Sequence, residues 1–174
     1  MGRIRLIAFD VDGTLTPGTL VLGPQGEAYK LFYAKDGLAI SLAHRLGYVT
    51  GLITGRFSET VRRRQEELRM DFASLGISDK VAAMDAVRRQ HGLAWEEIAY
   101  MGDDLNDLAL MEKAGFSGCP ADGAEENRAA ADFVSRWPGG AGAAREFIEA
   151  ILKKDGRWDE VVRSFREGAA AVRQ

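Results

Sequence analysis

Short apolar runs alternate along this chain with longer segments in which apolar side chains recur every three or four residues. The first run, residues 4–9, is broken only by Arg5, which is typical of a strand buried on both faces of a sheet. Further strands are predicted at residues 48–53, 98–101, 116–119 and 132–135. Strands that alternate with helices predict an α/β fold, in which a mostly parallel sheet carries helices on both faces.

Helices are predicted between these strands, where the apolar positions follow helical spacing. They cover residues 36–46, 58–70, 80–91, 105–113 and 141–154. Asp36 and Asp79 are expected to be N-caps, because an aspartate side chain accepts hydrogen bonds from the free amides of a first turn. Gly47 and Gly92 are expected to end the helices that these caps begin.

Residues 18–33 predict a β-hairpin inserted after the first strand, because two short segments flank the turn Gly23-Pro24-Gln25-Gly26. The 174 residues fit one domain, which we assign to residues 1–154. In residues 155–174, Trp158, Val161 and Phe165 recur at helical spacing, so this tail is predicted to be an amphipathic helix.

The formal charge is −3, from 23 basic and 26 acidic residues, so the composition does not favour a polyanionic partner. The basic run at residues 62–64 is followed at once by Glu66 and Glu67, and we interpret it as a solvated helix face. The single cysteine, Cys119, excludes an internal disulfide framework and a multi-cysteine zinc site. Because the first apolar run is too short for a secretory core or a membrane span, we expect a cytoplasmic protein without a nucleic-acid or membrane partner.

Polar residues follow the predicted strands at the points where these strands end. They are Asp10 and Asp12 after the first strand, Thr54 after the second, Lys80 at the start of a helix, and Asp103, Asp104 and Asp107 after the strand at residues 98–101. The carboxyl ends of parallel strands meet at one edge of a sheet, where ligands bind in open α/β folds. We therefore expect these side chains to converge.

Converging carboxylates predict a magnesium site, because Mg²⁺ prefers carboxylate, carbonyl and phosphate oxygens. Asp10 and Asp103 are predicted to be ligands, together with a backbone carbonyl near Asp12. Phosphate is the complementary partner, whose charge Lys80, the Thr54 hydroxyl and turn amides would share. Asp10 can then attack phosphorus as a nucleophile. Asp12 can protonate the leaving oxygen and afterwards activate water.

Each of these residues has an ordinary alternative role, and only their order and placement favour a phosphatase. An EF-hand is excluded because Val21 stands at the twelfth position, where a bidentate carboxylate is needed. The chain has no Gly-x-x-x-x-Gly-Lys-Ser/Thr loop and no Gly-x-Ser-x-Gly elbow. His44 and His91 fall in separate predicted helices and are interpreted as helix-surface residues.

These motifs resemble the haloacid dehalogenase superfamily of aspartyl phosphatases. Residues 10–16, Thr54, Lys80 and residues 102–107 look like its four motifs. The resemblance implies a Rossmann-like fold, an Asp10 nucleophile and an Asp12 acid/base. It also implies that Mg²⁺ is bound by Asp10, Asp12 and Asp103, with Asp104 or Asp107 in a supporting role, and that Thr54 and Lys80 bind the phosphoryl group.

A closer resemblance covers nearly the whole chain. Residues 30–38, 53–56, 79–80, 102–105 and 138–146 look like the 3-deoxy-D-manno-octulosonate 8-phosphate (KDO 8-phosphate) phosphatases, with departures at Thr14, Pro17 and residues 74–76. This resemblance implies hydrolysis of KDO 8-phosphate, with substrate contacts from Thr14, Gly55, Arg56 and Lys80. Arg56 is our candidate for holding the sugar carboxylate, because guanidinium pairs with carboxylates through two hydrogen bonds.

The spacing of the motifs leaves no room for a separate cap domain. Roughly 35 residues follow Asp12 and roughly 24 precede Lys80, whereas a domain needs about 50. The family resemblance implies a homo-tetramer in which a neighbouring chain covers the open site. The apolar hairpin residues agree with that expectation, since an isolated hairpin is marginally stable. They are Leu20, Leu22, Leu31 and Phe32.

Three other interpretations of the sequence stay open. A related branch hydrolyses nine-carbon ketoacid sugar 9-phosphates and tends to carry Glu and Lys where this chain has Arg56 and Glu67, which favours the eight-carbon substrate. A phosphotransferase or mutase could share the aspartyl intermediate, although the lack of a cap favours hydrolysis. Related domains also serve as catalytically idle oligomerisation modules, but the chemical motifs of this chain are intact.

Overall fold

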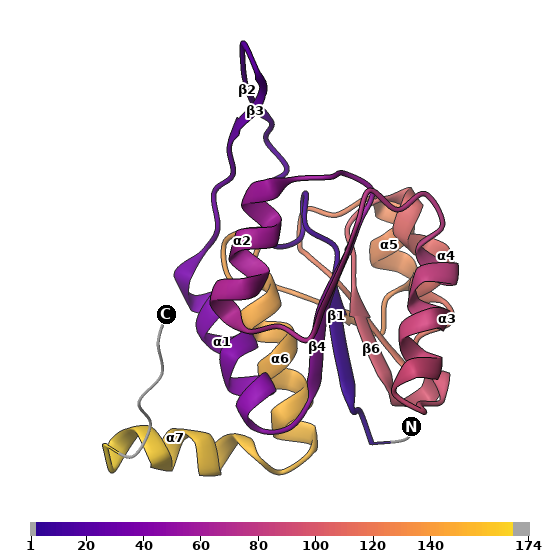
Figure 1. The fold of residues 1–174 in the computed structure, drawn as a ribbon. Coiled ribbons are helices and arrows are strands. Elements are labelled where there is room, and N and C mark those ends of the chain that lie inside the picture. Colours follow the sequence, from indigo (N-terminus) through magenta and orange to yellow (C-terminus); the bar gives the residue numbers. More distant parts are fainter. Residues whose placement is uncertain (1–2, 169–174) are drawn as a thin grey trace.

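A six-stranded parallel sheet forms the centre of the computed structural model, which describes residues 3–168 (Figure 1). Its strands are β1 (Leu6–Phe9), β4 (Val49–Thr54), β5 (Phe72–Leu75), β6 (Ile98–Met101), β7 (Phe116–Cys119) and β8 (Phe133–Val134). They lie in the order β5-β4-β1-β6-β7-β8, and every neighbouring pair is parallel. The predicted α/β fold with a parallel sheet is confirmed.

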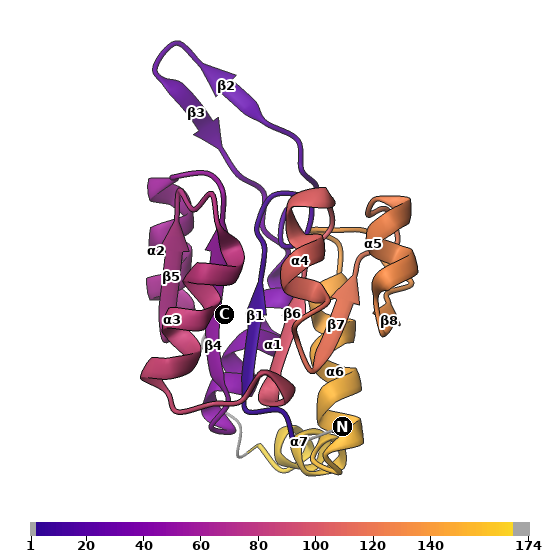
Figure 2. The same ribbon diagram turned by 90° about the vertical axis from the view of Figure 1, so that its right-hand side faces the viewer.

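Helices cover both faces of the sheet (Figures 1 and 2). One face carries α1 (Ala34–Arg45), α2 (Glu59–Leu68) and α6 (Ala143–Lys154), and the other carries α3 (Lys80–Gln90), α4 (Leu108–Met111) and α5 (Glu125–Ala130). Side chains of β1 alternate between the faces, as a strand requires. Ile7 and Phe9 belong to the core under α1 and α6, and Leu6 and Ala8 belong to the core under α3.

The register of the three central strands brings their carboxyl ends to one level. Phe9 of β1 lies opposite Leu52 of β4 and Met101 of β6. The residues that follow Phe9 and Met101 therefore leave the sheet together, next to the end of β4. At β1, the chain connections on either side run to opposite faces of the sheet. The carboxyl edge at such a point is the usual ligand position in open α/β folds.

The predicted hairpin is present as β2 (Val21–Gly23) and β3 (Gly26–Tyr29), which pair antiparallel and stand away from the sheet (Figures 1 and 2). Leu20, Leu22 and Leu31 are exposed, as expected of side chains that lack a partner within the chain. Phe32 differs, because it packs against the core and the Arg64 guanidinium lies 5.7 Å from its ring centre. Between β4 and α3 the chain forms only α2 and β5, so no cap domain is inserted there.

Two local predictions were wrong. Asp36 is not an N-cap, because α1 begins at Ala34 after Tyr33. Asp36 lies buried in the first turn instead and accepts a hydrogen bond of 2.8 Å from the backbone amide of Arg145, which joins α1 to α6. The single helix predicted at 105–113 is divided into the 3-10 helix η2 (Leu105–Asp107) and α4.

The predicted N-cap Asp79 is confirmed, since its side chain accepts a hydrogen bond from the backbone amide of Ala82. The short 3-10 helix η1 (Trp95–Glu97) precedes β6. We did not expect α5, whose sequence lacks the apolar periodicity on which the other helix predictions depended.

After α6, the chain forms α7 (Trp158–Arg166), which packs through the buried side chain of Val161. The Arg157 guanidinium donates to the backbone carbonyl of Leu46 at 2.8 Å, and the Arg145 guanidinium lies 5.1 Å from the Trp158 ring centre. Residues 169–174 of the predicted tail lie outside the described residues. None of the helices within residues 3–168 is long and apolar enough to cross a membrane.

Candidate active site

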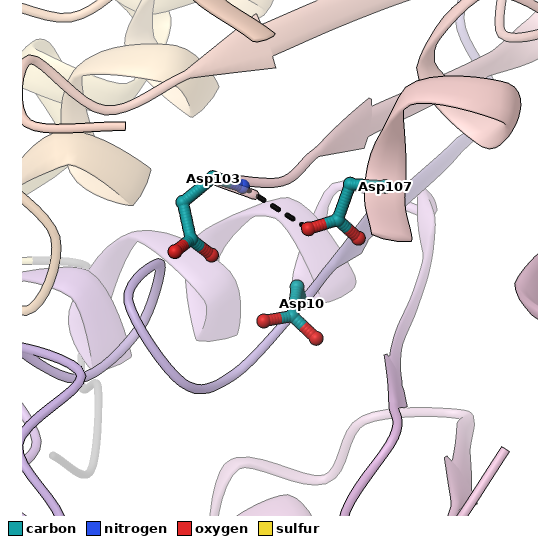
Figure 3. A group of neighbouring side chains, drawn as sticks. All are labelled: Asp10, Asp103 and Asp107. Atoms are coloured by element: carbon teal, nitrogen blue, oxygen red, sulfur yellow. Dashed lines mark hydrogen bonds between the residues drawn. The ribbon is translucent and has the colours of Figure 1, made fainter. Parts of the chain in front are cut away.

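Three carboxylates meet at the carboxyl edge of the sheet (Figure 3). Asp10 follows β1, Asp103 follows β6, and Asp107 ends η2. Each offers an oxygen within 4.8 Å of the others. Asp10 is 5% exposed and Asp107 is fully buried, so water screens their mutual repulsion poorly. The predicted convergence of Asp10 and Asp103 is confirmed.

Lys80 provides the positive charge that this cluster needs. Its ammonium donates to Asp10 Oδ1 at 2.7 Å and to Asp107 Oδ1 at 2.6 Å, and the side chain is buried. Lys80 is the first residue of α3, where the N-cap Asp79 fixes the helix start. Tyr100, buried in β6, donates its hydroxyl to Asp107 Oδ1 at 2.5 Å.

The acid–base properties of the cluster follow from burial and like charge. Burial, with the neighbouring Asp107 carboxylate, raises the pKa of Asp10 to about 6 although Lys80 opposes the shift. Burial and the Asp10 carboxylate raise the pKa of Asp103 to about 7. Burial alone would lower the pKa of Lys80, but Asp10 and Asp107 outweigh it and hold that pKa above its usual value. The cluster therefore favours a proton or a cation among its carboxylates.

Close backbone packing fixes the position of Asp103 and requires glycine beside it. The Thr14 hydroxyl donates to Asp103 Oδ1 at 2.9 Å, and the Asp103 amide donates to Asp107 Oδ2 at 3.2 Å (Figure 3). Gly13 has φ +95°, and a Cβ there would lie 1.9 Å from Asp103 Oδ2. A Cβ at Gly102 would lie 2.4 Å from Cγ of Asp107.

Asp104 lies outside this carboxylate cluster. Its side chain accepts a hydrogen bond of 2.8 Å from the Leu105 amide and so caps η2, and the residue is exposed. Its backbone carbonyl accepts a hydrogen bond of 2.6 Å from the Asn127 amide group of α5. Of the two aspartates that the sequence suggested as support for a metal, Asp107 is the one in the cluster.

The Asp12 carboxylate lies in a second group of charged residues. The Lys30 ammonium donates to Asp12 Oδ1, and Nε of Arg56 lies 3.8 Å from Asp12 Oδ2. Thr54 is buried at the end of β4, and Gly55 and Arg56 are exposed beside it. The Arg56 guanidinium thus faces a carboxylate of this chain rather than a backbone group.

Lys30 and Tyr100 have contacts in the site that sequence reasoning missed. Tyr100 carried a usable signal, because a tyrosine in a fully apolar strand needs a partner for its hydroxyl. Lys30 begins one of the segments that resemble the phosphatase family, but the resemblance gave it no role. Its contact with Asp12 joins residues 18 positions apart and depends on the path of the hairpin.

The donor set of the cluster suits a hard divalent cation. Asp10, Asp103 and Asp107 offer only carboxylate oxygens, and Mg²⁺ is usually bound by one or two carboxylates, water and phosphate oxygens. No histidine or cysteine belongs to this group, so nothing in it favours a softer metal.

Comparison with known proteins identifies a family and several similar phosphatases. The haloacid dehalogenase-like hydrolase family matches residues 53–147. The chain is 38% identical to the 3-deoxy-D-manno-octulosonate 8-phosphate phosphatase of Escherichia coli K12 over 158 residues, which are 91% of this chain and 84% of that protein. The phosphatase of the same name from Salmonella typhimurium is 37% identical over the same shares of the two chains.

Solved structures agree with these relatives. The 3-deoxy-D-manno-octulosonate 8-phosphate phosphatase of Moraxella catarrhalis, in complex with magnesium, phosphate and KDO, has a TM-score of 0.91 at 37% identity and covers 94% of both chains. The cobalt-bound deoxy-D-mannose-octulosonate 8-phosphate phosphatase of Haemophilus influenzae has a TM-score of 0.87 at 35% identity, over 90% of this chain and 91% of that one.

The raised pKa values predict how Mg²⁺ affinity depends on pH. Because the pKa of Asp10 is about 6 and that of Asp103 about 7, Mg²⁺ must displace protons at pH 6 but almost none at pH 8. The apparent affinity should therefore rise between these pH values and then level off. Isothermal titration calorimetry in buffers of different ionisation enthalpy measures both the affinity and the protons released. An affinity independent of pH would contradict the prediction.

Asp107 and Asp104 provide a matched pair for the same titration. Asp107→Asn should weaken Mg²⁺ binding by at least about 10-fold, the usual minimum effect of losing a group that orients a metal ligand. Asp104→Asn should leave the affinity nearly unchanged, because that carboxylate only caps η2. The reverse order of effects would assign the supporting role to Asp104.

Proposed function

The chain belongs to the haloacid dehalogenase-like hydrolases and, within them, to the 3-deoxy-D-manno-octulosonate 8-phosphate phosphatases, and on this premise we propose that it hydrolyses KDO 8-phosphate to KDO and inorganic phosphate with Mg²⁺ as cofactor. The observation that carries the proposal is the cluster of Asp10, Asp103 and Asp107, in which the Lys80 ammonium bridges Asp10 and Asp107. It occurs in a chain that matches these phosphatases over nine-tenths of its length.

The reaction has two displacements at phosphorus. In the first, an oxygen of Asp10 forms a bond to phosphorus while the bond from phosphorus to the sugar oxygen breaks, and Asp12 gives its proton to that oxygen. In the second, water attacks phosphorus and gives a proton to Asp12, and the bond to Asp10 breaks. Inorganic phosphate leaves, and both aspartates return to their initial state.

Other residues of the site are proposed to stabilise the negative charge of the phosphoryl group. The Lys80 ammonium lies 2.7 Å from Asp10 Oδ1, and Thr54, which carries a hydroxyl, is the last residue of the neighbouring strand β4. Thr14 and Gly55 lie in the loops after β1 and β4, where they are proposed to contact the substrate. Bound Mg²⁺ supplies positive charge that stabilises the transition state. We assign it to Asp10, Asp103 and the backbone carbonyl of Asp12.

The comparisons favour the eight-carbon substrate over a nine-carbon one, because the relatives above are named for the octulosonate. An idle module is disfavoured by the ion pairs among Asp10, Lys80 and Asp107, since decay of a site removes the pressure to keep buried charges. The cytoplasm is the location we propose for this reaction.

Asp10→Asn tests the reaction directly. The amide cannot act as the nucleophile, so kcat for KDO 8-phosphate should fall by at least about 10⁴-fold, as for other lost nucleophiles. Phosphate release with Mg²⁺ and with EDTA, across KDO 8-phosphate and nine-carbon 9-phosphates, measures mechanism, metal dependence and substrate together. Retained turnover by Asp10→Asn would identify a different nucleophile, and no release from any sugar phosphate would favour the idle module.

Arg56 is proposed to bind the carboxylate of the sugar acid. Its side chain is half-exposed and its Nε lies 3.8 Å from Asp12 Oδ2, so a substrate held at Asp12 would lie close to the guanidinium. Arg56→Ala should raise KM for KDO 8-phosphate by about 10-fold or more, the scale of a charged hydrogen bond. KM for para-nitrophenyl phosphate, which has no carboxylate, should change little. Equal increases for both substrates would contradict this role.

We propose a homo-tetramer in which hairpins pack against one another and neighbouring chains cover the site. The exposed apolar side chains of Leu20, Leu22 and Leu31 support an interface, because they all belong to one short hairpin that lacks a partner within the described residues. Light scattering at micromolar concentration should give four times the mass of the 19.0 kDa chain. Leu22→Asp with Leu31→Asp should lower that mass, whereas a monomeric wild type would end the proposal.

A further inference from the structure

Lys30 has a buried side chain, and its ammonium group has no part in the two displacements at phosphorus. It follows β3 at the base of the hairpin, and its side chain is only 3% exposed. The ammonium donates to Asp12 Oδ1 and lies 2.9 Å from Glu27 Oε2. A buried ammonium is costly unless paired, so these two carboxylates fix where the Lys30 head group can lie.

Glu27 is itself held in place. The Ser58 hydroxyl donates to Glu27 Oε1 at 2.5 Å. Ser58 is the N-cap of α2, and its hydroxyl oxygen accepts a hydrogen bond from the Val61 amide. Burial alone would raise the pKa of Glu27, but the hydrogen bonds from Ser58 and Lys30 outweigh it and keep that pKa below its usual value. Contacts thus run from the start of α2 through the hairpin to the loop after β1.

The contact with Lys30 distinguishes the two oxygens of Asp12. Oδ1 accepts from the ammonium, whereas Oδ2 is buried and has no hydrogen-bond partner among the described residues. Nε of Arg56 lies 3.8 Å from Oδ2, which is longer than a hydrogen bond. A carboxyl group fixed through one oxygen presents the other in a defined direction, as proton transfer to a leaving group requires.

We propose that Lys30 is a positioning residue, which holds the Asp12 carboxyl group through Oδ1 so that Oδ2 faces the leaving oxygen of the substrate. The inference rests on the proposed phosphatase function and extends it to the hairpin. The hairpin stands away from the sheet in both views and would otherwise serve only assembly (Figures 1 and 2). Its base instead belongs to the apparatus that delivers the proton.

The dependence on the leaving group separates this role from a structural one. The ratio kcat/KM reports the steps up to departure of the leaving group. A sugar alkoxide needs a proton to leave, whereas para-nitrophenolate is a stable anion near neutral pH. In Lys30→Met, kcat/KM should fall about 100-fold for KDO 8-phosphate, because general acid catalysis contributes at least about 100-fold when the leaving group is poor. For para-nitrophenyl phosphate, kcat/KM should fall less than about 5-fold.

Two variants control this experiment. Lys30→Arg keeps the positive charge and should recover kcat/KM for KDO 8-phosphate to within about 10-fold of the wild type, because charged hydrogen bonds to Asp12 are retained. Lys113→Met removes a lysine of the same length that lies over the Trp95 ring, and it should leave both substrates unchanged. Circular dichroism and light scattering verify the fold and mass of each variant.

Equal losses for both substrates in a folded Lys30→Met protein, or no loss for either, would overturn the inference. If that variant does not fold, Glu27→Gln serves in its place, because it loosens the ammonium without removing it. It must then lower kcat/KM for KDO 8-phosphate more than for para-nitrophenyl phosphate, and equal losses would again overturn the inference. A wild type that hydrolyses neither compound with Mg²⁺ would instead refute the proposed function.

Discussion

A buried ammonium between carboxylates is the interaction on which the site depends. Asp10, Asp103 and Asp107 repel one another when they are charged, and Lys80 supplies positive charge to Asp10 and Asp107 from the start of α3. Even so, the pKa values of Asp10 and Asp103 stay raised, so one ammonium does not satisfy three carboxylates. The negative charge that Lys80 does not neutralise is what suits the site to Mg²⁺, which in turn can bind a phosphoryl group.

The parallel sheet makes this arrangement possible. β1 lies between β4 and β6, and the shared register brings the ends of all three strands to one level. The backbone there is packed so tightly that Gly13 and Gly102 have no room for a side chain. Because the backbone around the site is packed this tightly, it holds the carboxylates in place against their mutual repulsion, which a flexible loop could not do.

The two functions proposed for the hairpin use different side chains. Its exposed apolar residues Leu20, Leu22 and Leu31 suit another copy of the chain. Its base places Lys30 against Asp12. If both proposals hold, a chain without a cap domain uses one short insert for assembly and also for orientation of the acid/base residue, which would link hairpin packing to the proton-transfer step.

The sequence by itself determined the strands, most of the helices and the motif residues, because these depend on local patterns. Apolar runs marked β1 and β6, and the aspartates that follow them met as the topology of a parallel sheet requires. Only the tertiary structure decided that Asp107 rather than Asp104 joins the cluster, that Asp36 joins α1 to α6, and that Lys30 reaches Asp12. Each of these depends on where a loop turns and which side chains are buried beside it. Such contacts join residues far apart in the chain, so no local pattern of residues records them.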